Sequence, residues 1–91
     1  RYEASGEINF TVGDAAACVE QVLKAFGSEI QSIDHLDGVT VDLGGGRWFN
    51  LRSSNTEPLL RLNVEARTTE EVDAIVERVA ARISATGSGA S

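Results

Sequence analysis

A polar loop with an arginine at each edge is the stretch of this chain best suited to chemistry. It runs from Arg52 to Arg61 and reads Arg-Ser-Ser-Asn-Thr-Glu-Pro-Leu-Leu-Arg. Four consecutive side chains, from Ser53 to Thr56, can donate hydrogen bonds, and the backbone N–H groups of a tight loop can do the same. Phosphate offers several acceptor oxygens, and the planar guanidinium of arginine binds it through two parallel hydrogen bonds. These residue types favour an anion, above all a phosphate group.

The same loop has a second interpretation that involves no ligand. Serine, asparagine, threonine, glutamate and proline are also ordinary turn residues. Arg61 could form an ion pair with Glu57 or Glu65, its neighbours in the sequence. On pattern alone, an anion site and a generic turn both remain open.

Composition bounds what the rest of the chain can be. Its 91 residues suffice for one domain with one core, and the formal net charge of −6 argues against nucleic acid or an anionic membrane as a partner. Cys18 is the single cysteine, so we expect neither an internal disulfide nor a metal framework. Nothing resembles a signal peptide or a membrane span. We therefore expect a reducing, cytoplasmic setting.

Alternation of apolar and polar residues predicts the strands. Such runs occupy Ser5 to Val12, Val39 to Leu43, Arg47 to Ser53 and Leu59 to Ala66. Turn sequences separate them, namely an Asp-Gly pair before the second run and three glycines after it. The stretch from Ile30 to Leu36 has no clear period, so its structure stays open.

A period of about 3.6 residues predicts two helices. The first runs from Ala15 to Phe26, with Asp14 as its N-cap and a glycine at its end. The second runs from Thr69 to Ile83, and the preceding Thr68 forms a capping box with the glutamate three residues later.

These elements, in the order β-α-β-β-β-α, predict an α+β fold. We expect a four-stranded antiparallel sheet with both helices on one face and the other face open. The folded domain should span residues 1–84, followed by a Gly/Ser/Ala tail, residues 85–91, that we expect to be disordered.

The two strands beside the loop predict where its arginines lie. If the strands form a hairpin, their apolar residues must share the face that the helices cover, so paired residue numbers must sum to an odd value. The symmetric choice among these pairings sets the predicted register, and a slide of two residues would leave the two arginines as diagonal neighbours. Like charges placed opposite each other destabilise a ladder by roughly a few tenths of a kcal/mol or more. A facing pair of arginines is therefore unfavourable for folding but suited to a dianion between them. The register predicts three facing pairs: Leu51 with Leu62, Phe49 with Val64, and Arg52 with Arg61.

The motif Arg-x-Ser-Asn-Thr-Glu-Pro-x-x-Arg resembles the phosphate-binding loop in the C-terminal, fourth domain of the α-D-phosphohexomutases. The similarity extends along nearly the whole chain except the tail. Asn55 favours the bacterial phosphomannomutase/phosphoglucomutase branch. The resemblance implies a TATA-box-binding-protein-like fold, in agreement with the element order. Further similar segments are Tyr2 to Asn9, Asp37 to Val39, Trp48 to Arg52 and Leu62 to Ala66.

The resemblance also implies a function. Enzymes of that family interconvert mannose or glucose 1-phosphate and 6-phosphate through a bisphosphorylated intermediate, using a phosphoserine and Mg²⁺ on other domains. This domain would grip the phosphate that is not reacting and would work with the other domains of the same enzyme. Carried over by position, the phosphate contacts would be Arg52, Ser54, Asn55 and Thr56, with Arg61 as a further contact and Ser53 and Glu57 supporting the loop.

Motifs for the chemical step are missing from this sequence. It contains no serine–histidine pair for phosphoryl transfer, no Asp-Gly-Asp-x-Asp metal loop and no sugar-binding Gly-Glu-x-Ser-Gly-His stretch. We therefore expect no catalytic residue, metal site or cofactor in this chain, and no mutase activity from the chain alone. An alternative function is a free-standing acidic interaction module whose arginine-flanked loop binds carboxylates of a protein partner.

Other reactive side chains have simpler interpretations. Cys18 lies on an apolar helical stripe and is expected to be a buried, inert thiol. His35 lies beside a turn and is expected to be solvated rather than to bind metal. Gly44 to Gly46 lack the lysine and the following helix of a nucleotide-binding loop, so a hairpin turn is the better interpretation. Trp48 belongs on the open face, where a domain contact is favoured over sugar stacking.

Overall fold

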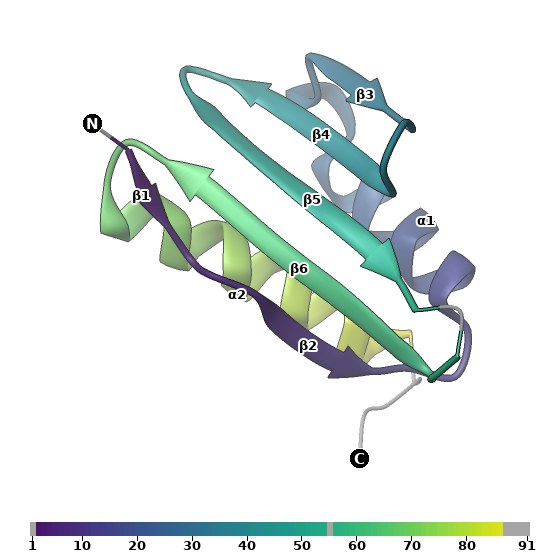
Figure 1. The fold of residues 1–91 in the computed structure, drawn as a ribbon. Helices are drawn as coiled ribbons and strands as arrows, with labels where there is room; N and C mark the ends of the chain where they lie inside the picture. The colour runs from purple at the N-terminus through teal and green to yellow at the C-terminus, as the bar shows by residue number, and fades with distance from the viewer. Residues whose placement is uncertain (1, 55, 87–91) are drawn as a thin grey trace.

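The structure, a computed structural model, describes residues 2–54 and 56–86. An antiparallel sheet forms one layer, and two helices lie against one of its faces (Figure 1). The elements in chain order are β1 (Glu3–Ala4), β2 (Ile8–Thr11), α1 (Ala15–Phe26), a short 3₁₀ helix (Gly27–Glu29), β3 (Ser32–Asp34), β4 (Val39–Gly44), β5 (Arg47–Ser53), β6 (Leu59–Ala66) and α2 (Thr69–Ala85).

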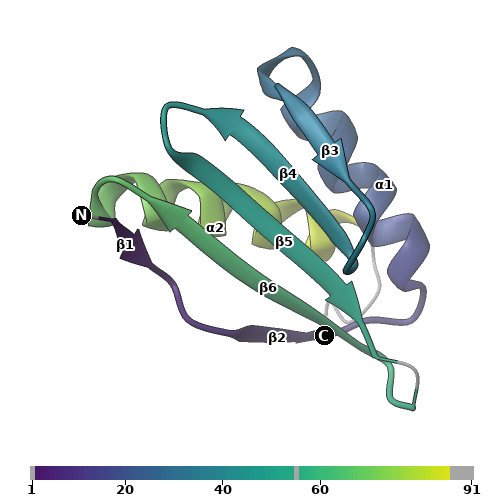
Figure 2. The same ribbon diagram turned by 45° about the horizontal axis from the view of Figure 1, so that its top comes forward.

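Strand β6 lies at the centre of the arrangement. The sheet order is β1-β6-β5-β4-β3, and β2 pairs with the same side of β6 as β1 does (Figure 2). All pairings are antiparallel. The polar loop joins β5 to β6, so it lies at one end of the two innermost strands.

The α+β class is confirmed, but the sheet has six strands where four were predicted. The predicted strand from Ser5 to Val12 is wrong in its bounds because the chain breaks its pairing around Gly6, which has a φ of 72°. At this break both the N–H and the hydroxyl of Ser5 bond to the backbone of Val64, each at 2.9 Å. The result is two short strands, β1 and β2, along β6.

The stretch from Ile30 to Leu36, which shows no clear period in the sequence, contains an additional strand, β3. It pairs with β4 at the edge of the sheet, and its central residue, Ile33, is 40% exposed. All three side chains of this edge strand are exposed, so its sequence has no need to alternate between apolar and polar residues. The predicted turns at Asp37-Gly38 and at Gly44 to Gly46 are confirmed, since each joins two antiparallel strands.

Helix α1 has the predicted bounds. The Oδ1 atom of Asp14 accepts the N–H of Ala17 at 3.1 Å, and Gly27 ends the helix with a φ of 43°. Among the described residues, no helix is long and apolar enough to cross a membrane.

Helix α2 continues to Ala85, two residues beyond the predicted end. Thr68 Oγ1 accepts the N–H of Glu71 at 3.1 Å, which is half of the predicted capping box. The other half does not form, because Glu71 Oε1 is buried without a hydrogen-bond partner within residues 2–54 and 56–86. Ala85, assigned to the predicted tail, belongs to the helix, and residues 87–91 of that tail lie outside the described residues.

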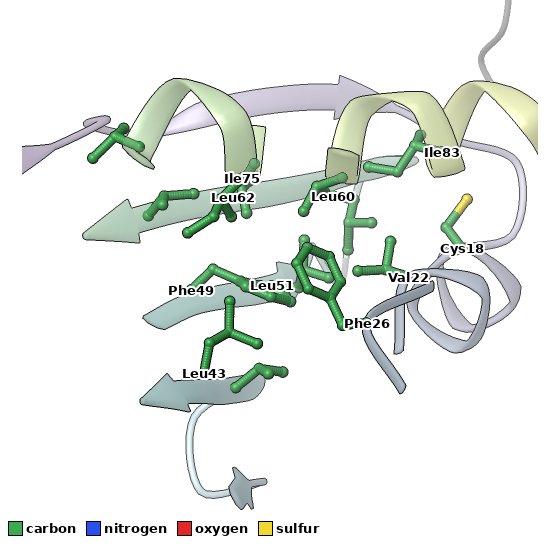
Figure 3. Packing of buried hydrophobic residues seen from close by; sticks show 14 of the residues in the cluster. Cys18, Val22, Phe26, Leu43, Phe49, Leu51, Leu60, Leu62, Ile75 and Ile83 are labelled. Atoms are coloured by element: carbon green, nitrogen blue, oxygen red, sulfur yellow. The ribbon is translucent and has the colours of Figure 1, made fainter. Parts of the chain in front are cut away.

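One apolar core fills the space between the sheet and the two helices (Figure 3). Phe49 of β5 packs on Phe26 of α1 with ring centroids 5.0 Å apart, and Cys18 is fully buried, as predicted. Arg78 of α2 lies 4.0 Å above the Phe26 ring and bonds to both carboxylate oxygens of Glu29, at 3.0 and 2.8 Å. This ion pair lowers the pKa of Glu29 and links α2 to the short 3₁₀ helix that follows α1.

The predicted register of the central hairpin is confirmed. Leu51 lies opposite Leu62, Phe49 opposite Val64, and Arg52 opposite Arg61. The apolar members of this set are all buried under the helices. Because side chains alternate between faces along a strand, the arginines lie on the open face.

The position of Phe49 in the core predicts a large loss of stability when its side chain is truncated. We expect Phe49→Ala to lower the free energy of unfolding by about 3–5 kcal/mol, since it removes a buried ring and leaves a cavity. Urea denaturation of the whole chain measures this loss. Leu36→Ala is the control, because Leu36 is 92% exposed, and it should change stability by less than about 0.5 kcal/mol. Equal effects of the two substitutions would contradict the assigned core.

Candidate functional site

Two arginines face each other where the central hairpin opens into its loop. Arg52 is near the end of β5 and Arg61 near the start of β6. Their side chains are 51% and 42% exposed, so an ion from solvent can reach both. Two positive charges are thus held opposite each other on a face without covering helices.

Each arginine lies close to a different carboxylate. Arg52 Nε is 3.3 Å from Asp37 Oδ1, and Arg61 Nε is 3.6 Å from Glu7 Oε2. Neither ion pair was predicted. The alternatives considered for Arg61, Glu57 and Glu65, are not the groups that the structure places against it.

The interaction of Arg61 with Glu7 is an ion pair without a hydrogen bond. Arg61 Nε is buried and has no hydrogen-bond partner among the described residues. The donor capacity of this arginine is therefore only partly used. Arg61, like Arg52, retains N–H groups that could bind an incoming acceptor.

The hydroxyl of Ser54 organises the loop. Its Oγ accepts the backbone N–H groups of Thr56 and Glu57, each at 3.2 Å, and lies 3.5 Å from Thr56 Oγ1. The Ser54 N–H donates to the carbonyl oxygen of Leu59 at 3.1 Å, which closes the loop at its base. Two backbone N–H groups of the loop therefore point toward the same side-chain oxygen, Ser54 Oγ.

The remaining predicted loop residues are only partly placed. Ser53, Thr56 and Glu57 are exposed, and the Glu57 carbonyl oxygen accepts the N–H of Leu59 at 2.7 Å. Glu57 therefore takes part in the loop through its backbone. Asn55, the other predicted phosphate contact, lies outside the described residues.

A hollow of about 930 Å³ occupies the open face of the sheet beside Arg52. It extends from the glycine turn between β4 and β5 to Arg52 and Asp37, and Trp48 lines it. Trp48 Nε1 donates to Glu65 Oε1 at 3.0 Å, so the indole is fixed in place. Sequence reasoning placed Trp48 on this face but missed the hollow, because its shape depends on the twist and order of the strands.

Other candidate groups do not join the site. His35 is exposed in the connection between β3 and β4. Within the part of the chain that the structure describes, no group of three or more histidine, cysteine, aspartate and glutamate side chains is placed to hold a metal ion. The loop and its flanking strands present hydroxyl groups, backbone N–H groups and two guanidinium groups.

The loop geometry predicts a specific effect of removing the Ser54 hydroxyl. We expect Ser54→Ala to speed hydrogen exchange of the Thr56 and Glu57 amides roughly two- to tenfold, since one net hydrogen bond contributes about 0.5–1.5 kcal/mol. Hydrogen exchange followed by NMR measures this change. Ser53→Ala is the matched control, because the Ser53 hydroxyl bonds to none of the described residues, and a similar effect there would contradict the role of Ser54.

Comparisons with known proteins agree on one family. The family model for the phosphoglucomutase/phosphomannomutase C-terminal domain matches residues 7–82. The chain is 55% identical over 67 residues to phosphohexose mutases of Xanthomonas campestris pv. campestris, which is 74% of this chain and 15% of theirs. It is 42% identical over 79 residues to a phosphomannomutase of Methanocaldococcus jannaschii, covering 87% of this chain and 17% of that protein.

A solved structure shows the same fold. A phosphoglucomutase/phosphomannomutase family protein from Burkholderia thailandensis superposes with a TM-score of 0.68 over 96% of this chain and 18% of that chain, at 18% identity. The chain spans about 15% of the length of the phosphohexose mutases it matches. It therefore belongs to the phosphoglucomutase/phosphomannomutase family and corresponds to the C-terminal domain of its members.

Proposed function

We propose that this chain is the part of a hexose-phosphate mutase that grips the phosphate group that is not reacting. The observation that carries the proposal is the facing pair Arg52 and Arg61 beside a loop whose hydroxyls and amides gather at Ser54. The proposed ligand is mannose or glucose 1-phosphate or 6-phosphate. Relatives called phosphomannomutase and phosphohexose mutase support this ligand class.

The arginine pair is unfavourable in the empty domain. Two like charges directly opposite each other destabilise a ladder by roughly 0.2–1 kcal/mol. Exposed ion pairs such as those with Asp37 and Glu7 offset little of this, because solvent screens them. A phosphate dianion between the guanidinium groups would remove the repulsion and form charge-assisted hydrogen bonds with both.

The loop would supply the remaining donors. The hydroxyls of Ser54 and Thr56 and the amides now bonded to Ser54 Oγ could turn to the phosphate oxygens. Asn55, between these two residues, would contribute its side-chain amide, and Glu57 would support the loop through its backbone carbonyl. Such a grip positions the substrate and neutralises its charge.

The chemical step belongs, in this proposal, to other domains of the whole enzyme. Mg²⁺ and the phosphoryl-carrying serine would be held there, as the resemblance to the phosphohexomutases implies. The identity of the sugar would also be read elsewhere, since this loop offers groups that suit phosphate. The isolated chain should then bind hexose phosphate weakly, with a Kd near roughly 1 mM or above, because most of the enclosing surface is absent.

An amide chemical-shift titration with glucose 1-phosphate tests the proposal. We expect saturable shifts confined to residues 53–57 and Arg61, and a loss of affinity of roughly tenfold or more in Arg52→Ala, because one charged donor is removed. Arg67→Ala is the matched control, since Arg67 is exposed at the other end of β6, and it should leave the affinity within about twofold.

Two outcomes would contradict the proposal. The first is an absence of loop shifts at roughly 50 mM ligand, far above the expected Kd. The second is equal shifting by acetate at matched ionic strength, which would favour a loop that binds the carboxylates of a protein partner.

A further inference from the structure

The two carboxylates next to the facing arginines come from opposite sides of the central hairpin. Asp37 lies in the turn between β3 and β4, beyond the β5 side. Glu7 lies in the connection between β1 and β2, beyond the β6 side. Each arginine is thus paired outward, with a carboxylate on its own side of the hairpin.

The turn that carries Asp37 is fixed against strand β5. Asn50 Nδ2 donates to the Asp37 carbonyl oxygen at 2.8 Å and to Thr40 Oγ1 at 2.9 Å. Asn50 precedes Arg52 by two residues and therefore shares its face of the sheet. Strand β5 therefore carries Arg52 and, through Asn50, also fixes the turn that places the Asp37 carboxylate beside Arg52.

Gly38 allows this turn to lie directly against Arg52. A Cβ atom at Gly38 would be 2.5 Å from the Leu51 carbonyl oxygen and 2.6 Å from Arg52 Cγ. The φ of Gly38 is also positive, at 73°, which disfavours other residues. The proximity of Asp37 to Arg52 is therefore built into the backbone.

Glu7 is positioned by the break between β1 and β2. It follows Gly6, and the two bonds of Ser5 to Val64 anchor the chain at this point. The Glu7 carboxylate lies 3.6 Å from Arg61 Nε, near enough for charge attraction and too far for a strong hydrogen bond.

We propose that Asp37 and Glu7 are internal counter-ions that compete with phosphate for Arg52 and Arg61. This inference rests on the proposed function of the loop. Binding then exchanges two ion pairs of the empty domain for one ligand shared by both arginines. The carboxylates contribute little to stability, because both pairs are exposed.

The net charge of the two arginines and two carboxylates determines how strongly they attract phosphate. The two guanidinium groups and the two carboxylates sum to zero, so an approaching dianion meets a neutral cluster. Removal of either carboxylate leaves a net charge of +1 and removes one competitor. The counter-ions thus keep the grip weak and reversible, which suits a site that must release its ligand in every catalytic cycle.

Titration with inorganic phosphate tests this competition in Asp37→Asn, Glu7→Gln and the double variant. We expect each single change to tighten phosphate binding roughly three- to tenfold at low ionic strength, by Coulomb attraction over several ångströms, and less at high salt. Glu77→Gln is the matched control, since it removes the same charge from the exposed surface of α2 and should leave the affinity within about twofold.

A rise in phosphate affinity in the variants would mean that the carboxylates compete with phosphate, whereas a fall would mean that they support its binding. Unchanged or weaker phosphate binding in both single variants, with the wild-type loop still responding to phosphate, would overturn this inference and leave the proposed function standing. An absence of any wild-type response would overturn both. The free energy of unfolding, measured with urea on the same variants, should stay within about 0.5 kcal/mol of wild type, which separates altered binding from altered folding.

Discussion

The register of β5 against β6 is the constraint on which the rest of the structure depends. Leu51 and Leu62 are buried under the helices, and a slip of one residue would turn every side chain of a strand to the opposite face. The apolar core therefore excludes a shift by one residue, and the observed pairing keeps both leucines buried. That pairing places Arg52 opposite Arg61, so the burial of leucines determines where two like charges meet.

Folding and the proposed phosphate binding use alternate residues of the same two strands. The residues that face the helices carry the stability, whereas those on the open face form the hollow and the arginine pair. Both helices lie on one side of the sheet, so the arginines stay accessible (Figure 1). Within this domain, the proposed phosphate site uses only strands that already form the core.

Local pattern was enough to predict α1, the central register and the two hairpin turns. Local pattern could not predict contacts between residues that are far apart in the sequence. The break at Gly6 depends on bonds between Ser5 and Val64, which are 59 positions apart. Strand β3 buries too little to show a period, and the partners Asp37 and Glu7 follow from the strand order, which alternation alone does not specify.

The central claim is that Arg52 and Arg61 share one phosphate. NMR of the arginine Nε–Hε signals during a phosphate titration tests it most directly, because it observes both guanidinium groups at once. Both signals should move along a single saturation curve with one Kd, while the signals of Arg67 and Arg82 stay unchanged. Movement of one signal alone, two different Kd values, or a uniform drift of all arginines would contradict it.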